Sequence, residues 1–118
     1  MEIGPHNGLL SIELSKVGYK MDSIEYDKKY YELTKNIIDL CDVSERVKVT
    51  FDDIYNVYKD ISKFEYDFIA SLSVFYHLKR NNTTAFESLI IDLIEKSKII
   101  IFDDEPNTNI FNFDDINN

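Results

Sequence analysis

Strand-like and helix-like segments alternate along this 118-residue chain from one end to the other. Short runs rich in β-branched and aromatic residues predict strands, and apolar residues spaced three or four apart predict helices. Strands are expected at 2–3, 19–24, 47–51, 66–72 and 99–102, with helices at about 8–16, from 28, at 54–61 and from 85. This order predicts one α/β domain, a doubly wound and mainly parallel sheet with helices on both faces.

The longer helices and the last strand predict which residues are buried. Asp27 is expected to cap the helix that follows it, and Thr84 with Glu87 forms a capping box before the last helix. The inward faces are expected to hold Tyr30, Leu33, Ile37 and Cys41 in the first of these helices and Phe86, Leu89, Ile90, Leu93 and Ile94 in the second. The strand 99–102 is apolar at every position, as parallel strands covered on both faces are. Cys41, the single cysteine, is therefore expected to be a buried structural thiol.

Charge is distributed unevenly along the chain. The formal net charge is −9, and residues 103–118 hold five acids and no base. Residues 1–105 are therefore expected to form the domain, and 106–118 an acidic, asparagine-rich tail. The chain lacks the concentrated basic surface that nucleic-acid binding needs, so a small-molecule substrate is favoured. A solvated turn is favoured over a divalent-ion site at Asp103-Asp104-Glu105, and no metal is expected.

No apolar run approaches the ~18 residues of a membrane span. The first residues also lack the basic and hydrophobic regions of a secretory leader. No membrane association is expected, and the predicted location is the cytoplasm.

Acidic and glycine residues gather where the expected strands end. Glu2 closes a short apolar stub, Gly4 and Gly8 follow it, and Glu25 lies 21 positions after Gly4. In an open parallel sheet, ligands bind beyond the carboxyl ends of the strands. A carboxylate at the end of the second strand can take both hydroxyls of a ribose, while a glycine turn and a helix N-terminus approach the rest of a nucleotide. The sequence therefore predicts a nucleotide-cofactor site.

Residues 1–102 resemble the cofactor half of a class I S-adenosylmethionine-dependent methyltransferase, a Rossmann-like fold. The family's first motif is acidic-x-Gly-x-Gly-x-Gly; Glu2, Gly4 and Gly8 match it, and His6 holds the middle glycine place. The resemblance implies that Glu2 orients the methionine amino end through the loop and that Gly4 and Gly8 let the chain pass close to it. Histidine is among the non-glycine residues that most often tolerate positive φ, so His6 is compatible with this loop.

The resemblance also assigns roles further along the chain. Glu25 would bind the ribose hydroxyls, and Tyr26 would pack on the adenine. Asp53 would accept a hydrogen bond from the adenine amino group, and Ile54 would cover the other face of the ring. Ser71 is expected at the cofactor, in a segment from Ser71 to His77 that lies near the transferred methyl group.

The implied function is methyl transfer from S-adenosyl-L-methionine to an oxygen or nitrogen atom of a small-molecule acceptor. His77 is the candidate general base, although a structural histidine at a strand end explains it equally well. A dinucleotide-binding oxidoreductase is the less favoured alternative, because it expects Gly-x-Gly-x-x-Gly and this loop does not supply it. An ordinary doubly wound domain with coincidental acids at its strand ends is another.

Only three residues precede Gly4, whereas the first strand of this family usually has four or five before its glycine. The sheet is therefore expected to be truncated at the first strand and after the fifth. A second reading follows, in which the chain is a truncated or inactive cofactor-binding fragment without catalysis. A partner chain or a missing segment would then complete the sheet.

Overall fold

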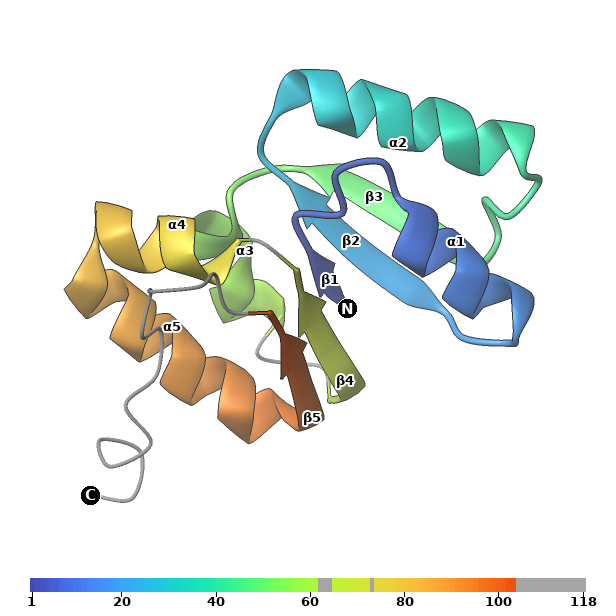
Figure 1. The fold of residues 1–118 in the computed structure, drawn as a ribbon. Coiled ribbons are helices and arrows are strands. Elements are labelled where there is room, and N and C mark those ends of the chain that lie inside the picture. The colour runs from blue at the N-terminus through green and yellow to red at the C-terminus, as the bar shows by residue number, and fades with distance from the viewer. Residues whose placement is uncertain (62–64, 73, 104–118) are drawn as a thin grey trace.

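The computed structural model describes residues 1–61, 65–72 and 74–103, and these form a five-stranded sheet in the order β3-β2-β1-β4-β5 (Figure 1). The strands are β1 (Glu2–Ile3), β2 (Met21–Glu25), β3 (Val47–Phe51), β4 (Tyr66–Ser71) and β5 (Ser97–Phe102). All neighbouring strands are parallel. The doubly wound, parallel α/β fold predicted from the sequence is confirmed.

The two-residue strand β1 lies at the centre of this sheet. Glu2 is in register with Ser23 of β2 on one side and with Ala70 of β4 on the other. Because neighbouring side chains alternate, Glu2 and Ile3 point to opposite faces. Ile3 joins the larger apolar core, whereas Glu2 points to the face that carries the first two helices.

The described residues form five helices, which pack on the two faces of the sheet (Figure 1). Helices α1 (Leu9–Lys16) and α2 (Lys28–Leu40) lie on one face, over β1, β2 and β3. Helices α3 (Ile54–Ile61), α4 (Phe75–Asn81) and α5 (Thr83–Lys96) lie on the other. Each face has its own apolar core, and the larger core is on the α5 side. No helix of the described residues is both long and apolar enough to cross a membrane.

The two helix caps predicted from the sequence had different outcomes. Asp27 caps α2 as expected, because its Oδ1 accepts hydrogen bonds from the amides of Lys29 and Tyr30. The predicted cap at Thr84 is wrong. Asn82 caps α5 instead, since its Oδ1 accepts from the amide of Ala85 at 3.1 Å, so the helix begins at Thr83 and Thr84 lies inside it.

The predicted inward face of α2 is wrong at two positions. Thr34 and Ile38 are buried, whereas Leu33 is 40% exposed and the Cys41 thiol is exposed rather than buried. The Thr34 hydroxyl donates to the His6 carbonyl at 2.9 Å, and its methyl group lies against Gly8. This polar anchor sets the rotation of α2, and apolar spacing alone does not reveal it.

The last strand and last helix are buried on one side only. Ile100 and Phe102 pack on the larger core, as do Phe86, Leu89, Ile90 and Leu93 of α5. Ile99 and Ile101 are 59% and 48% exposed, and Ile94 is 46% exposed, so the prediction of burial at these three positions is wrong. For Ile99 and Ile101 the physical reason is that none of the described helices lies over β4 and β5 on the α1 side (Figure 1). Ile94 lies outside the buried face of α5, which is formed by Phe86, Leu89, Ile90 and Leu93. The predicted tail, 106–118, lies outside the described residues.

Candidate functional site

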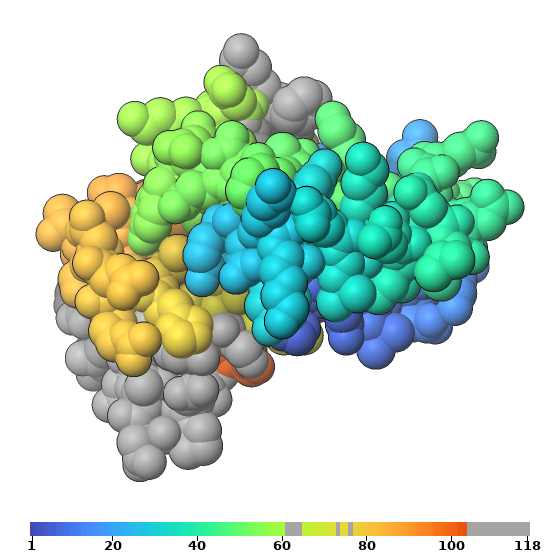
Figure 2. Space-filling view, turned by 90° about the horizontal axis from the view of Figure 1, so that it is seen from above, coloured from blue at the N-terminus to red at the C-terminus, as the bar shows by residue number. Residues whose placement is uncertain are grey.

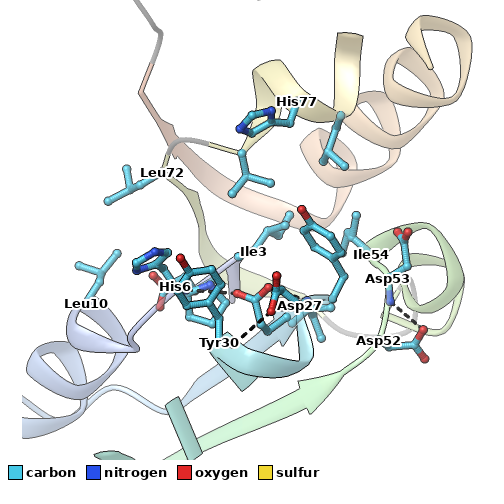
Figure 3. Close-up of a pocket in the computed structure, with 18 of the residues that line it drawn as sticks. Ile3, His6, Leu10, Asp27, Tyr30, Asp52, Asp53, Ile54, Leu72 and His77 are labelled. Carbon is cyan, nitrogen blue, oxygen red and sulfur yellow. Dashed lines mark hydrogen bonds between the residues drawn. The ribbon is translucent and has the colours of Figure 1, made fainter. Parts of the chain in front are cut away.

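A cavity of about 780 Å³ opens at the carboxyl ends of β1, β2 and β3 (Figure 3). One wall is formed by the loop after β1 and by the segments after β2 and β3. The opposite wall is formed by Leu72 and by residues of α4. The starts of α2, α3 and α4 are far apart in sequence but lie side by side on this surface (Figure 2). The volume is within the ~300–1,000 Å³ typical of small-molecule sites.

The loop after β1 has a left-handed backbone at three positions. Gly4, His6 and Gly8 have φ of 67°, 57° and 75°. A Cβ on Gly4 would lie 2.5 Å from Cγ2 of Val74, on the opposite wall. Glycine is therefore required at position 4 both for its backbone conformation and for the close approach of the two walls. Histidine adopts the left-handed conformation at the middle position, in agreement with the sequence-based expectation.

Glu25 links this loop to the end of β2. Its side chain is only 3% exposed, and it lines the cavity. One carboxylate oxygen accepts from the His6 amide at 3.2 Å, and the other accepts from the Asp27 amide at 2.9 Å. Each carboxylate oxygen can accept a second hydrogen bond. Glu25 is thus held in place by backbone groups and retains acceptor capacity.

The His6 side chain packs against α2. Its ring centroid is 3.9 Å from that of Tyr30, with the planes tilted by 32° (Figure 3). The His6 amide is bound by Glu25, and its carbonyl accepts from Thr34. Both rings line the cavity. Tyr30 was assigned to the core by its spacing, and the sequence carried no signal that it would reach the cavity.

Glu2 lies beneath the loop with its carboxylate almost fully buried. It accepts a hydrogen bond from the Ser11 hydroxyl of α1, and the hydroxyls of Ser11 and Ser23 are 2.9 Å apart. Burial raises the pKa of the Glu2 carboxyl, and the hydrogen bonds from Ser11 partly oppose that rise. A carboxylate here costs folding free energy, which is typical of a residue kept for its charge.

The segment after β3 supplies two more carboxylates. Asp53 Oδ1 accepts from the Tyr55 amide at 2.9 Å, and Asp52 Oδ1 accepts from the Asp53 amide at 2.7 Å. Both residues line the cavity beside Ile54, which is 4% exposed. Tyr26, 67% exposed, lines the cavity near Glu25. The predicted cofactor residues of β2 and β3 therefore face one cavity.

Helix α4 forms the wall that sequence reasoning missed. Val74, His77, Leu78 and Asn81 line the cavity from this side, and Phe75 anchors the helix in the core. With seven residues, α4 is too short for a clear helical period. In Figure 3 the His77 ring lies across the cavity from His6. It belongs to this helix and not to a strand end.

The Arg80 guanidinium fixes the hydrogen-bonding role of the His77 ring. Arg80 Nη2 is 3.2 Å from His77 Nδ1. A guanidinium only donates, so Nδ1 accepts in this contact. A role as base through Nδ1 therefore requires the Arg80 contact to open.

Two predicted site residues do not line the cavity. Ser71 is fully buried at the end of β4, and its hydroxyl has no hydrogen-bond partner among the described residues. Leu72, the next residue, lines the cavity instead. Gly8 lies at the start of α1 and packs against Thr34. The other predicted residues line the cavity: Glu2, Gly4, His6, Glu25, Tyr26, Asp53, Ile54 and His77.

Comparison with known proteins identifies the fold. No protein-family model matches the sequence, and no curated protein matches it. The chain superposes on a crystal structure of monomeric WbdD with a TM-score of 0.77 and 16% identity, over 92% of this chain and 27% of WbdD. A structure described as the bifunctional kinase-methyltransferase WbdD gives 0.75 and 17%, over 86% of this chain and 22% of that one.

A third structure carries a cofactor product. The chain superposes on a SAM-dependent methyltransferase from Thiobacillus denitrificans in complex with S-adenosyl-L-homocysteine, with a TM-score of 0.65 and 15% identity. The match covers 92% of this chain and 44% of that enzyme, so the chain spans less than half the length of each of these proteins. At such identities the comparisons show the fold, which is that of the class I methyltransferases.

Proposed function

We propose that this chain, whose fold is that of the class I methyltransferases, binds S-adenosyl-L-methionine. It would transfer the methyl group to an oxygen or nitrogen atom of a small-molecule acceptor. A cytoplasmic location belongs to the same proposal.

One observation carries the proposal. The Glu25 carboxylate is fixed by the amides of His6 and Asp27 and lines a cavity that the Gly4 loop and Asp53 also line. A carboxylate that is oriented before binding can accept two hydroxyl groups with little loss of conformational entropy. This arrangement suits the ribose of an adenosine better than a phosphate, because the described residues that line the cavity include five carboxylates and no lysine or arginine.

Other residues that line the cavity can contact the rest of the cofactor. None of the hydrogen bonds among the described residues uses the second oxygen of Asp53, which can accept from an adenine amino group, and Ile54 offers an apolar surface for the ring. Three carboxylates line the cavity beside the loop after β1, those of Glu2, Glu25 and Asp27. Their negative charge favours a cationic ligand. S-adenosylmethionine carries a positive sulfonium, whereas NAD carries a pyrophosphate.

When bound, the cofactor supplies an electrophilic methyl group, and the acceptor loses one proton. The chain's own residues would position rather than react, since direct displacement depends mainly on alignment at about 3 Å in a dry site. Val74 and Leu78 offer an apolar wall across from the Gly4 loop, and the His77 ring lines the cavity on the same side.

Calorimetric titration with S-adenosylmethionine, S-adenosylhomocysteine and NAD tests the binding step. We expect both sulfur ligands to bind, and NAD to bind more weakly or not at all. Tighter binding of NAD would refute the proposal.

Transfer is tested separately, with methyl-labelled cofactor and a panel of small amines and alcohols. Label in an acceptor product supports the enzyme. Cofactor binding without transfer to any member of the panel favours the alternative, a cofactor-binding domain without catalysis.

A further inference from the structure

Among the described residues, no helix covers an apolar surface on the α1 side of β4 and β5. It consists of Tyr19, Phe68, Ile99 and Ile101, and we call it the β5 face. Phe68 is in register with Ile99 and Ala70 with Ile101, so these side chains share one face of the sheet. The rings of Tyr19 and Phe68 meet edge to face, with centroids 5.5 Å apart. Tyr19, Ile99 and Ile101 are 44%, 59% and 48% exposed, whereas both faces of a parallel sheet are usually covered.

We propose that the chain's own C-terminal segment, residues 104–118, docks on the β5 face. The segment contains the apolar residues Ile110, Phe111 and Phe113. Burying these side chains against Ile99 and Ile101 would complete the second layer over β4 and β5.

The position and length of the segment fit this surface. It starts two residues after Phe102, where β5 ends, so it begins at the edge of the face that it would cover. The six residues of β5 extend over about 20 Å. The ten residues from 104 to 113 can span about 33–36 Å, enough to reverse at Pro106 and return along the strand.

One exposed lysine lies near the end of the path that such a segment would take. A segment that returns along β5 carries Asp114 and Asp115 toward the amino ends of the strands. Lys20 lies at that edge, next to Tyr19 and just before β2, and it is exposed. Opposite charges there would support docking only weakly, because the pair is near solvent.

Helix α5 offers a matched control. Ile91 is 59% exposed, as is Ile99, but it lies on the outer side of a helix that packs on the opposite face of the sheet. Docking on the β5 face predicts energetic coupling of the segment to Ile99 and none to Ile91.

A double-mutant cycle in the full chain tests this. The variants are Ile99→Ser, Phe111→Ser with Phe113→Ser, and their combination, and the measurement is Tm. We expect Ile99→Ser to lower Tm by about 4–8 °C in the wild-type background. It should have little effect once Phe111 and Phe113 are replaced, whereas Ile91→Ser should give the same small shift in both backgrounds. Equal effects of Ile99→Ser in the two backgrounds would overturn the proposal.

Crosslinking gives a second readout that does not depend on stability. In a Cys41→Ser background, Ile99→Cys with Phe111→Cys should form an intramolecular disulfide under mild oxidation, and Ile91→Cys with Phe111→Cys should not. A disulfide that forms only between two chains, with a Tm that rises with protein concentration, would instead show a second copy on this face. Both cofactor titrations and methyl transfer are separate from these measurements, so the two proposals can fail independently.

Discussion

The two walls of the cavity are built by different means. On the wall of β1, β2 and β3, carboxylates of Glu25, Asp52 and Asp53 hold backbone amides and fix the loops. On the α4 wall, Val74 and Leu78 are apolar, and the short helix is held by Phe75 in the core. The loops of the first wall are thus fixed by hydrogen bonds to carboxylates. The second wall is attached to the apolar core and presents Val74 and Leu78 beside His77 and Asn81.

This contrast separates two tasks. A cofactor that carries many polar groups needs acceptors whose positions are fixed before binding. An acceptor molecule that only has to be aligned beside a methyl group needs shape and exclusion of water. The first wall therefore suits the cofactor, and the second suits the acceptor. The two walls are in contact at Gly4 and Val74. A substitution at Gly4 therefore tests the arrangement of both walls.

Gly4→Ala should have the largest effect. Left-handed backbone at a non-glycine residue and overpacking against Val74 each cost about 1–3 kcal/mol. We expect a loss of unfolding free energy of about 2–6 kcal/mol, measured by urea denaturation, together with weaker binding of S-adenosylhomocysteine.

Two other glycines serve as controls for Gly4. Gly18, with φ of 107°, has open space where a Cβ would lie, so Gly18→Ala reports backbone strain alone. A Cβ at position 8 would meet Thr34, and Gly8 does not line the cavity. Gly8→Ala should therefore destabilise the fold and leave the affinity of the folded protein for S-adenosylhomocysteine nearly unchanged. If Gly4→Ala were no worse than Gly18→Ala, the close contact between the walls would not exist in solution.

Glu25→Ala should weaken S-adenosylhomocysteine binding by about 1.5–3 kcal/mol, the usual worth of hydrogen bonds to a charged group. The same carboxylate holds two backbone amides, so a loss of stability should accompany the loss of affinity. Asp53→Ala should weaken binding less, because one adenine contact is lost instead of a ribose pair. Calorimetry on both variants, with circular dichroism for the fold, gives the comparison. Unchanged affinity in both folded variants would place the site elsewhere.

The polar wall was largely readable from the sequence, and the apolar wall was not. Glycines at 4 and 8 and acids at the ends of strands are local signals, since backbone conformation and strand position decide them. Helix α4 has too few residues for a period, and its place depends on Phe75 reaching the core. The rotation of α2 could not be predicted from local spacing either. It depends on the hydrogen bond from the Thr34 hydroxyl to the His6 carbonyl, which joins residues 28 positions apart.

Glu2→Gln should alter how stability depends on pH. Burial raises the pKa of Glu2 above its ordinary 4.5, so the native state binds the proton more tightly than the unfolded chain. The wild type should therefore lose stability as pH rises from about 4.5 through the raised pKa. Glu2→Gln removes this component, so it should be more stable than the wild type at neutral pH, with the difference fading below pH 4.5. Thermal unfolding at several pH values measures this.

A Glu2→Gln variant that is less stable at neutral pH and equally pH-dependent would show that the carboxylate is not desolvated. Glu13→Gln, at an exposed position of α1, is a suitable control.

His77→Ala should have the smallest effect on the cofactor. The ring is exposed on the α4 wall, so S-adenosylhomocysteine affinity should change by less than about 0.5 kcal/mol. If methyl transfer is measurable, the effect of His77→Ala should appear in turnover and not in cofactor affinity. A large loss of cofactor affinity would mean that the α4 wall binds the cofactor and not only the acceptor. Arg80→Ala, which removes the donor to Nδ1, tests whether the ring can act as a base through that atom.

The most direct test of the central claim is a crystal structure of the chain with S-adenosylhomocysteine bound. We predict that the ribose hydroxyls contact the Glu25 carboxylate, that the adenine lies between Ile54 and Tyr26 near Asp53, and that the sulfur faces Val74 and His77. Density for the ligand outside this cavity, or inside it with the ribose away from Glu25, would contradict the account.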